Sequence, residues 1–83
     1  MNKIILIQNK KEPQKREFNH ILIVPEKDYE MVSEIVKNSI DEYYKVDRED
    51  YYIGFLKRVL LRRGFNNIEF YTEKEFYSNI YNY

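Results

Sequence analysis

The sequence predicts a small two-layer α+β domain: a three-stranded, mainly antiparallel sheet packed by an α-hairpin, in the order β-β-α-α-β with a short C-terminal helix or strand. Short runs of β-branched and aromatic residues lie near both ends of the chain, and two longer stretches between them have apolar residues at helical spacing. An α-hairpin returns the chain to the end of the sheet that it left, so the last strand is expected to run antiparallel to the second. The length of 83 residues corresponds to one domain, residues 1–83.

The first predicted strand, residues 3–8, contains an uninterrupted run of isoleucine and leucine. Such a run is typical of a strand that is covered on both faces. The second predicted strand, residues 18–24, ends before Pro25 because proline has no N–H to donate to a strand ladder. The polar connector, residues 9–17, is expected to close an antiparallel hairpin. The apolar pattern of the first strand then requires a cover, from either the C-terminal segment or a second subunit.

Two amphipathic helices are predicted next. The first begins near residues 26–28, where acidic side chains suit the positive end of the helix dipole, and its apolar stripe extends to Tyr43. Asp47 is expected to cap the second helix by accepting a hydrogen bond from the backbone N–H of Asp50. Gly54 lies inside this helix, where glycine costs about 1 kcal/mol relative to alanine. We expect it to allow close helix packing, the alternative being the approach of a partner to the backbone.

The end of the second helix has the clearest boundary signal. Gly64 is expected to adopt the left-handed conformation just beyond the helix, and Phe65 to fold back onto Leu60. Helical spacing adds Leu56 and Val59 to the predicted core.

A third strand is predicted over residues 68–71, followed by a capping box in which Thr72 and Glu75 satisfy each other's backbone N–H groups. The capping box favours a short C-terminal helix, and a fourth strand is the alternative.

The composition argues against catalysis and cofactor binding. The chain has no cysteine, one histidine and two glycines, so thiolate metal sites and glycine-rich phosphate loops are excluded. His20 has no second histidine for metal ligation and no serine near it in sequence, which favours a structural role. We therefore expect a non-enzymatic protein without a metal or other cofactor. The absence of cysteine fits a reducing cytoplasm, and no apolar run approaches the roughly 18 residues of a membrane span.

The formal net charge is zero, but the charges are segregated along the chain. Residues 25–56 are net acidic and residues 57–67 are net basic. Such segregation affects association with charged partners more than it affects the fold. The abundance of asparagine, lysine, isoleucine and tyrosine, with no alanine, indicates an AT-rich genome such as that of a low-GC bacterium or one of its phages.

Tyrosines and acidic residues cluster around the predicted turn between the two helices. Tyrosine offers a large, rigid contact area with a polar tip, and surrounding carboxylates select a basic partner surface. The candidate partner-binding residues are Tyr43, Tyr44, Asp47, Glu49, Asp50 and Tyr51. The alternative is that the tyrosines on the apolar stripe belong to the core and that their neighbours have no role.

A basic cluster on the second helix, within residues 57–63, predicts a different function. Its residues are Lys57, Arg58, Arg62 and Arg63. They can face phosphates, so nucleic-acid binding, or regulation through it, is the alternative function. The sequence pI of 6.6 is below the usual range of nucleic-acid binders, and the cluster is also explained by the helix C-terminal dipole.

No motif identifies a family. The size, neutral charge, AT-rich composition and lack of catalytic groups are similar in type to those of small phage or mobile-element proteins, anti-CRISPR proteins among them, that bind and block a host protein. That similarity implies an inhibitor whose partner is a host protein with a basic surface. Apolar residues near both ends of the chain also predict a homodimer.

Overall fold

The computed structural model describes the backbone of residues 1–8, 14, 19–45 and 51–81, and the side chains of these residues up to Ser78. The elements are β1 (Asn2–Ile7), β2 (His20–Pro25), a 3₁₀ turn η2 (Glu26–Asp28), α1 (Tyr29–Tyr44), α2 (Tyr52–Arg62), β3 (Glu69–Thr72) and α3 (Glu73–Tyr81). The sheet has the strand order β1-β2-β3, and both pairs are antiparallel. The predicted fold class is confirmed, and the C-terminal segment is a helix rather than a fourth strand.

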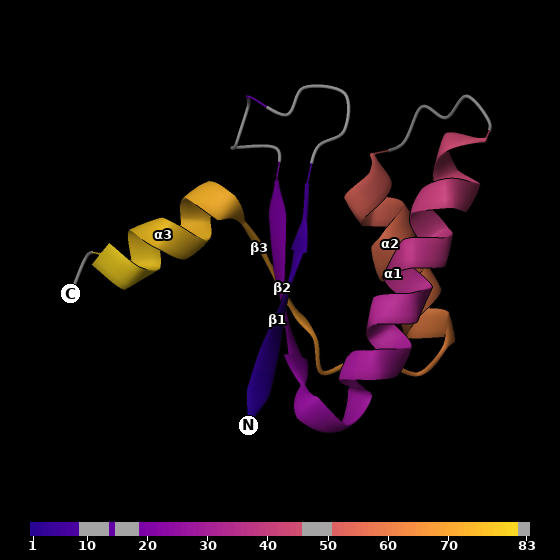
Figure 1. Cartoon of the computed structure of the whole chain (residues 1–83), viewed down its shortest axis with the longest axis horizontal. Helices are drawn as coiled ribbons and strands as arrows, with labels where there is room; N and C mark the ends of the chain where they lie inside the picture. Colours follow the sequence, from indigo (N-terminus) through magenta and orange to yellow (C-terminus); the bar gives the residue numbers. More distant parts are fainter. Residues whose placement is uncertain (9–13, 15–18, 46–50, 82–83) are drawn as a thin grey trace.

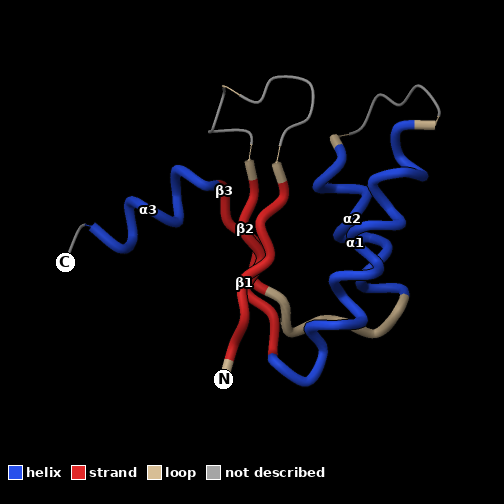
Figure 2. The backbone as a smooth tube through the Cα atoms, viewed as in Figure 1, coloured by secondary structure: helices blue, strands red, loops and turns tan. Residues whose placement is uncertain are grey.

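The helices are divided between the two sides of the sheet. Figure 1 shows α1 and α2 together on one side and α3 leaving the sheet on the other. The tube in Figure 2 shows the chain passing from β2 into α1, through the helical hairpin, and back to the sheet at β3. This path places β3 beside β2 as predicted.

The main core lies between the sheet and the helical hairpin. Its five most buried side chains come from β2, α1 and α2, and each has an exposed fraction below 2%: Leu22, Val24, Val32, Leu56 and Leu60. Val59 and Phe65 are partly buried and pack against this cluster. The predicted apolar stripe of the second helix is therefore confirmed as the side that faces the sheet.

The other face of the sheet is partly open. Alternation along β2 places Ile21 and Ile23 on this face, and the strand register pairs them with Leu6 and Ile4 of β1. Ile4 and Leu6 are 53% and 50% exposed. The expectation that the first strand is covered on both faces is wrong for the single chain, because β1 is an edge strand and α1 and α2 pack on one face only.

The end of α2 forms the predicted glycine stop. Gly64 has a φ of +86°. The N–H of Phe65 donates to the carbonyl of Leu60 at 2.9 Å, and the N–H of Gly64 donates to the carbonyl of Leu61 at 3.1 Å. These are the two hydrogen bonds of a Schellman motif, and they turn the chain toward β3.

The start of α2 differs from the prediction. The helix begins at Tyr52 and its N-cap position is Tyr51. Among the described residues, no side chain caps it by a hydrogen bond. The expectation that Asp47 caps the helix is wrong, since a capping side chain reaches only the second or third helical N–H and Asp47 precedes Tyr52 by five positions. Asp47 itself lies outside the described residues.

The start of α3 is held by reciprocal hydrogen bonds. The N–H of Glu75 donates to Thr72 Oγ1 at 3.0 Å, and the N–H of Thr72 donates to Glu75 Oε1 at 3.0 Å, which confirms the capping box. Donation by Thr72 holds the pKa of the Glu75 carboxyl below its usual range. One residue into the helix, the buried Glu73 carboxylate accepts from Asn19 Nδ2 at 2.8 Å, and its N–H donates to the Asn19 carbonyl. These contacts join α3 to the beginning of β2.

Gly54 does not serve close helix packing. In the described part of the chain, a Cβ at this position meets one heavy atom within 4 Å, Arg58 Nη1 at 3.9 Å, which is an ordinary contact. The expectation of a close approach at Gly54 is therefore wrong, and its neighbourhood has room for a side chain.

Leu60→Ala is expected to lower the free energy of unfolding by about 2–5 kcal/mol, because it removes a side chain that is 1% exposed from the centre of the core. Leu61→Ala is the matched control, since Leu61 is 63% exposed, and a change of about 0.5 kcal/mol or less is expected. Urea denaturation measures both. A Leu60→Ala variant as stable as the control would remove this helix face from the core.

The two glycines are expected to respond to alanine with opposite signs. Gly54→Ala should raise the free energy of unfolding by up to about 1 kcal/mol, because alanine favours the helix and its Cβ fits. Gly64→Ala should lower it by about 1–2 kcal/mol, because a φ of +86° is strained for a residue with a Cβ. Denaturant midpoints of the two variants test this, and a shift of the same sign in both contradicts it.

Candidate interaction surface on the helical hairpin

An aromatic cluster fills the end of the hairpin where α1 finishes and α2 begins. Tyr43 is its centre: its ring centroid lies 5.1 Å from that of Tyr44, 5.4 Å from Tyr52 and 5.7 Å from Phe55. Edge and tilted arrangements at these distances are favourable for aromatic pairs. The cluster holds the two helix ends together; below, "tyrosine end" denotes Tyr43, Tyr44, Tyr51, Tyr52 and Phe55.

A hydrogen-bond network anchors the Tyr52 ring of this cluster to α1. Tyr52 Oη and Ser39 Oγ are hydrogen-bonded at 2.7 Å, and Ser39 Oγ donates to the Val36 carbonyl at 2.9 Å. Burial raises the pKa of Tyr52 to about 12, although the bond to Ser39 opposes that rise. The hydrogen bond between the buried Ser39 and the partly buried Tyr52 fixes the orientation of the Tyr52 ring.

Two tyrosines of this end are exposed. Tyr51 is 84% exposed and Tyr44 is 44% exposed, whereas Tyr43 and Tyr52 are partly buried. The structure thus brings Tyr43, Tyr44 and Tyr51 of the predicted site to one end of the hairpin. The other predicted members of the site lie outside the described residues: Asp47, Glu49 and Asp50.

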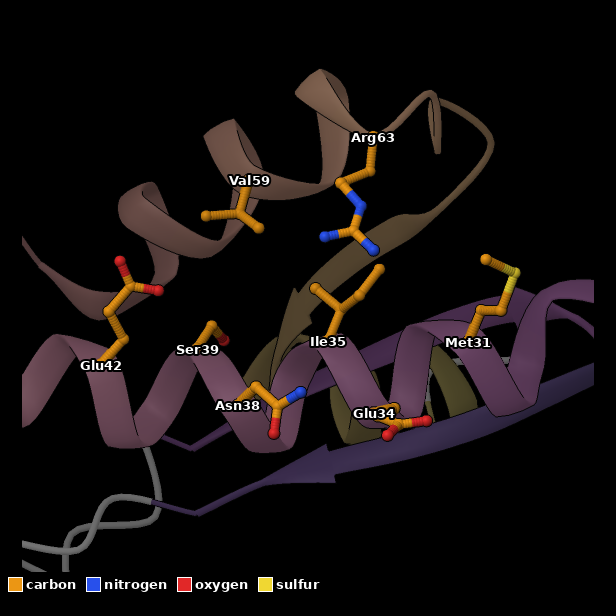
Figure 3. A pocket seen from close by; sticks show the side chains of 8 residues that line it. All are labelled: Met31, Glu34, Ile35, Asn38, Ser39, Glu42, Val59 and Arg63. Carbon is orange, nitrogen blue, oxygen red and sulfur yellow. The ribbon is translucent and has the colours of Figure 1, made fainter.

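A groove between α1 and α2 adjoins the tyrosine end. Its volume is ≈ 280 Å³. The lining residues are Met31, Glu34, Ile35, Asn38, Ser39, Glu42, Val59 and Arg63 (Figure 3). Ser39 belongs to both features, because it lines the groove and bonds the Tyr52 hydroxyl. In Figure 3 the Arg63 side chain reaches from α2 toward Ile35.

The sequence did not predict the groove, although the residues that line it on α1 have a recognisable spacing. Met31, Glu34, Asn38 and Glu42 follow one another at steps of three and four residues along α1. This spacing places them on one flank of the helix, beside the apolar stripe that faces the core. Which flank faces α2 depends on how the helices pack, and the spacing does not specify that.

The basic residues of α2 do not form one patch. Lys57 Nζ lies 5.2 Å from the ring centroid of Phe70 on β3, whereas Arg63 lines the groove beside α1. Arg58 and Arg62 are both exposed and share a helix face at i, i+4. The predicted nucleic-acid site is thus divided among three sides of the helix.

Other chemistry finds little support in the part of the chain that the structure describes. There, no three histidine, cysteine, aspartate or glutamate side chains group so as to hold a metal ion. Within the same residues, no helix has both the length and the apolar character needed to cross a membrane. The buried Ser33 Oγ has no hydrogen-bond partner among the described residues.

No protein-family model matches the chain, and no curated protein or solved structure matches it either. A function must therefore be inferred from the exposed residues and their surroundings.

The raised pKa of Tyr52 predicts a pH-dependent stability difference. Tyr52→Phe should cost about 1 kcal/mol near pH 7, because it removes the hydroxyl bonded to Ser39. Tyr52 ionises near pH 10 in the unfolded chain and near pH 12 when folded, so the wild type loses stability as the pH rises through this window. The variant lacks this loss, and the difference should shrink between about pH 10 and 12.

Urea denaturation of both proteins from pH 7 to 12 measures this difference, in which the other tyrosines cancel. Tyr51→Phe is the control, because it removes an exposed hydroxyl, and it should change the stability by less than about 0.5 kcal/mol. A deficit of Tyr52→Phe that stays constant to pH 12 would contradict the burial of this hydroxyl.

Proposed function

We propose that this chain is a non-enzymatic, cytoplasmic protein-binding module that inhibits a host protein by stoichiometric binding, as phage or mobile-element inhibitors of the anti-CRISPR type do. Its contact surface in this proposal is the tyrosine end together with the adjoining α1/α2 groove. The observation that carries the proposal is Tyr51, a large aromatic residue that is 84% exposed beside a packed aromatic cluster.

Exposed tyrosines on a rigid support are suited to protein recognition. Tyr44 contacts Tyr43, which in turn packs against Tyr52 and Phe55. The aromatic rings behind Tyr44 are therefore already packed before a partner binds. Few side chains of this chain lose conformational freedom on binding, which keeps the entropic cost low. Aromatic residues that become buried at an interface centre are the ones that most often dominate its affinity.

The charges around this surface favour a basic partner. Glu34 and Glu42 line the groove, and Asp41 is exposed on the same helix. Arg63 lies on the opposite wall of the groove. An acidic surface steers positively charged partners and excludes acidic ones. In this proposal the partner presents an apolar side chain to the groove and basic side chains to its rim.

Nucleic-acid binding remains the rival proposal. Arg58 and Arg62 are exposed on one helix face, which supports it. Lys57 and Arg63 lie on different sides of α2, which reduces the number of phosphates that the cluster can contact together. Since nucleic-acid affinity depends mainly on the number of neutralised phosphates, this separation weakens the rival.

The test begins with affinity capture from a low-GC bacterial lysate on the immobilised chain, followed by measurement of the Kd for the captured protein. The wild type is expected to bind one protein with one-to-one stoichiometry. Tyr44→Ala combined with Tyr51→Ala should weaken this binding by at least about 30-fold, the equivalent of about 2 kcal/mol, since both side chains would be central contacts. Thermal melts establish that the variants are folded.

Tyr77→Ala is the matched control. Tyr77 is 45% exposed, close to the 44% of Tyr44, but it lies on α3 on the other side of the sheet. Its loss should leave the affinity unchanged. Capture of no specific protein, or equal loss in both variants, would refute the proposed surface.

A gel shift with mixed DNA and RNA at low salt tests the rival. A shift that is lost in Arg58→Glu with Arg62→Glu, kept in the tyrosine variants and weakened steeply by salt would replace protein binding with nucleic-acid binding.

A further inference from the structure

Within the residues that the structure describes, the edge of β1 that faces away from β2 is the part of the sheet with the most unused backbone hydrogen-bonding groups. Among the described strands, β1 pairs with β2 alone. The ladder runs without a bulge from the pair Asn2 with Pro25 to the pair Ile7 with His20. The opposite side of β1 is therefore a straight edge six residues long.

The hydrogen-bonding direction of each β1 residue follows from the ladder. The N–H of Glu26 donates to the carbonyl of Met1 at 3.0 Å, in register with the other pairs. Antiparallel strands alternate between residues that bond to the neighbour and residues that point away. The backbone groups of Asn2, Ile4 and Leu6 therefore point to the free edge, each with one N–H and one carbonyl.

This edge lacks the usual protection against pairing with another strand. Natural edges are protected by proline, bulges, short length or charged side chains. Within β1 the sole charged residue is Lys3. Its ammonium lies 4.9 Å from the ring centroid of Tyr29, on the helix side, so its charge is directed toward α1 and not along the edge. Ile4 and Leu6, at the edge, are half exposed and uncharged.

The other edge of the same sheet is protected. β3 has four residues, of which Glu69 is charged. The N–H of Glu73 donates to the carbonyl of Asn19, in register with the β2–β3 pairs. By the same alternation, the backbone N–H and carbonyl groups of Phe70 and Thr72 point away from β2, toward the outer edge of β3. The outward N–H of Thr72 is already taken by Glu75 Oε1. The contrast identifies β1 as the edge at which the sheet can extend.

We propose that β1 pairs antiparallel with β1 of a second copy of this chain, so that two three-stranded sheets join into one six-stranded sheet. An antiparallel pair about a two-fold axis requires a strand that matches itself, and β1 does so. Centring the axis on Ile5 places Ile4 opposite Leu6 of the partner copy, and Leu6 opposite the partner's Ile4, with their outward backbone groups facing one another.

Charge and area support a second copy as the occupant. The formal net charge is zero, so two copies approach without net repulsion, and an uncharged edge offers nothing by which to select a charged partner. The contact is about 20 Å long and about one sheet, or roughly 10 Å, thick. It therefore buries less than the roughly 800 Å² per partner of a standard interface. The dimer is expected to form at high micromolar concentration and to dissociate on dilution.

The mass in solution tests the pairing. Light scattering coupled to gel filtration should give twice the 10.3 kDa of one chain at high micromolar concentration. Ile4→Lys with Leu6→Lys should give the single-chain mass, because like charges then oppose each other across the axis. Mixing this variant with an Ile4→Glu, Leu6→Glu variant should restore the doubled mass, which also shows that the substituted chains are folded.

Leu61→Lys is the control, since Leu61 is 63% exposed on α2, and it should dimerise like the wild type. Amide hydrogen exchange separates edge pairing from packing of the open sheet faces. Edge pairing should slow exchange of the Ile4 and Leu6 N–H groups by at least tenfold at dimer concentration, whereas face packing leaves these N–H groups free. A wild type that stays at 10.3 kDa, a doubly lysine-substituted variant that dimerises, or a dimer without this protection would each overturn the proposal.

Discussion

The left-handed turn at Gly64 is the constraint on which the rest of the fold depends. Its two backbone hydrogen bonds end α2 at Arg62 and send the chain back toward the sheet. Because of that turn, Phe65 packs against the core and β3 arrives antiparallel to β2. The position of β3 then sets where α3 begins, through the capping box and the Asn19–Glu73 contacts. A helix that continued past this point would leave β2 with a single neighbour.

Sequence patterns within a few residues of one another predict the glycine stop, the capping box and the apolar stripes, because the hydrogen bonds and the periodicity of these features are local. Such patterns do not predict features that depend on which helices and strands pack together. Ile4 and Leu6 looked like a doubly covered strand, but exposure depends on strand order, and β1 is at an edge. The fit of a side chain at Gly54 and the existence of the groove depend on helix packing. Helical spacing is also local, and it agrees with the exposure of the tyrosines: Tyr43, at the end of the predicted apolar stripe, is partly buried, whereas the adjacent Tyr44 is exposed.

The two candidate contact regions differ in the physics that each offers to a partner. The tyrosine end provides aromatic side chains held by a packed cluster and by the Ser39–Tyr52 hydrogen bond. The β1 edge provides backbone donors and acceptors with two aliphatic side chains. Side-chain surfaces discriminate among partners, whereas backbone edges pair with strands in general. The tyrosine end belongs to the helical hairpin and the β1 edge to the sheet, so the two regions share no residue.

The joint between Asn19 and Glu73 spans 54 positions of the chain, and this separation bears on the order of folding. The β1–β2 hairpin and the α1–α2 hairpin each close short loops, whereas the β2–β3 ladder needs the entire helical hairpin between its strands. Closing the longer loop loses more chain entropy, so this ladder is expected to assemble last. Until this ladder forms, the backbone groups of Ile21 and Ile23 on β2 are unpaired. The partly folded chain then has two strand edges open to pairing, that of β2 and that of β1. When β3 pairs with β2, it covers the first of these edges, and α3 then closes the joint between Glu73 and Asn19.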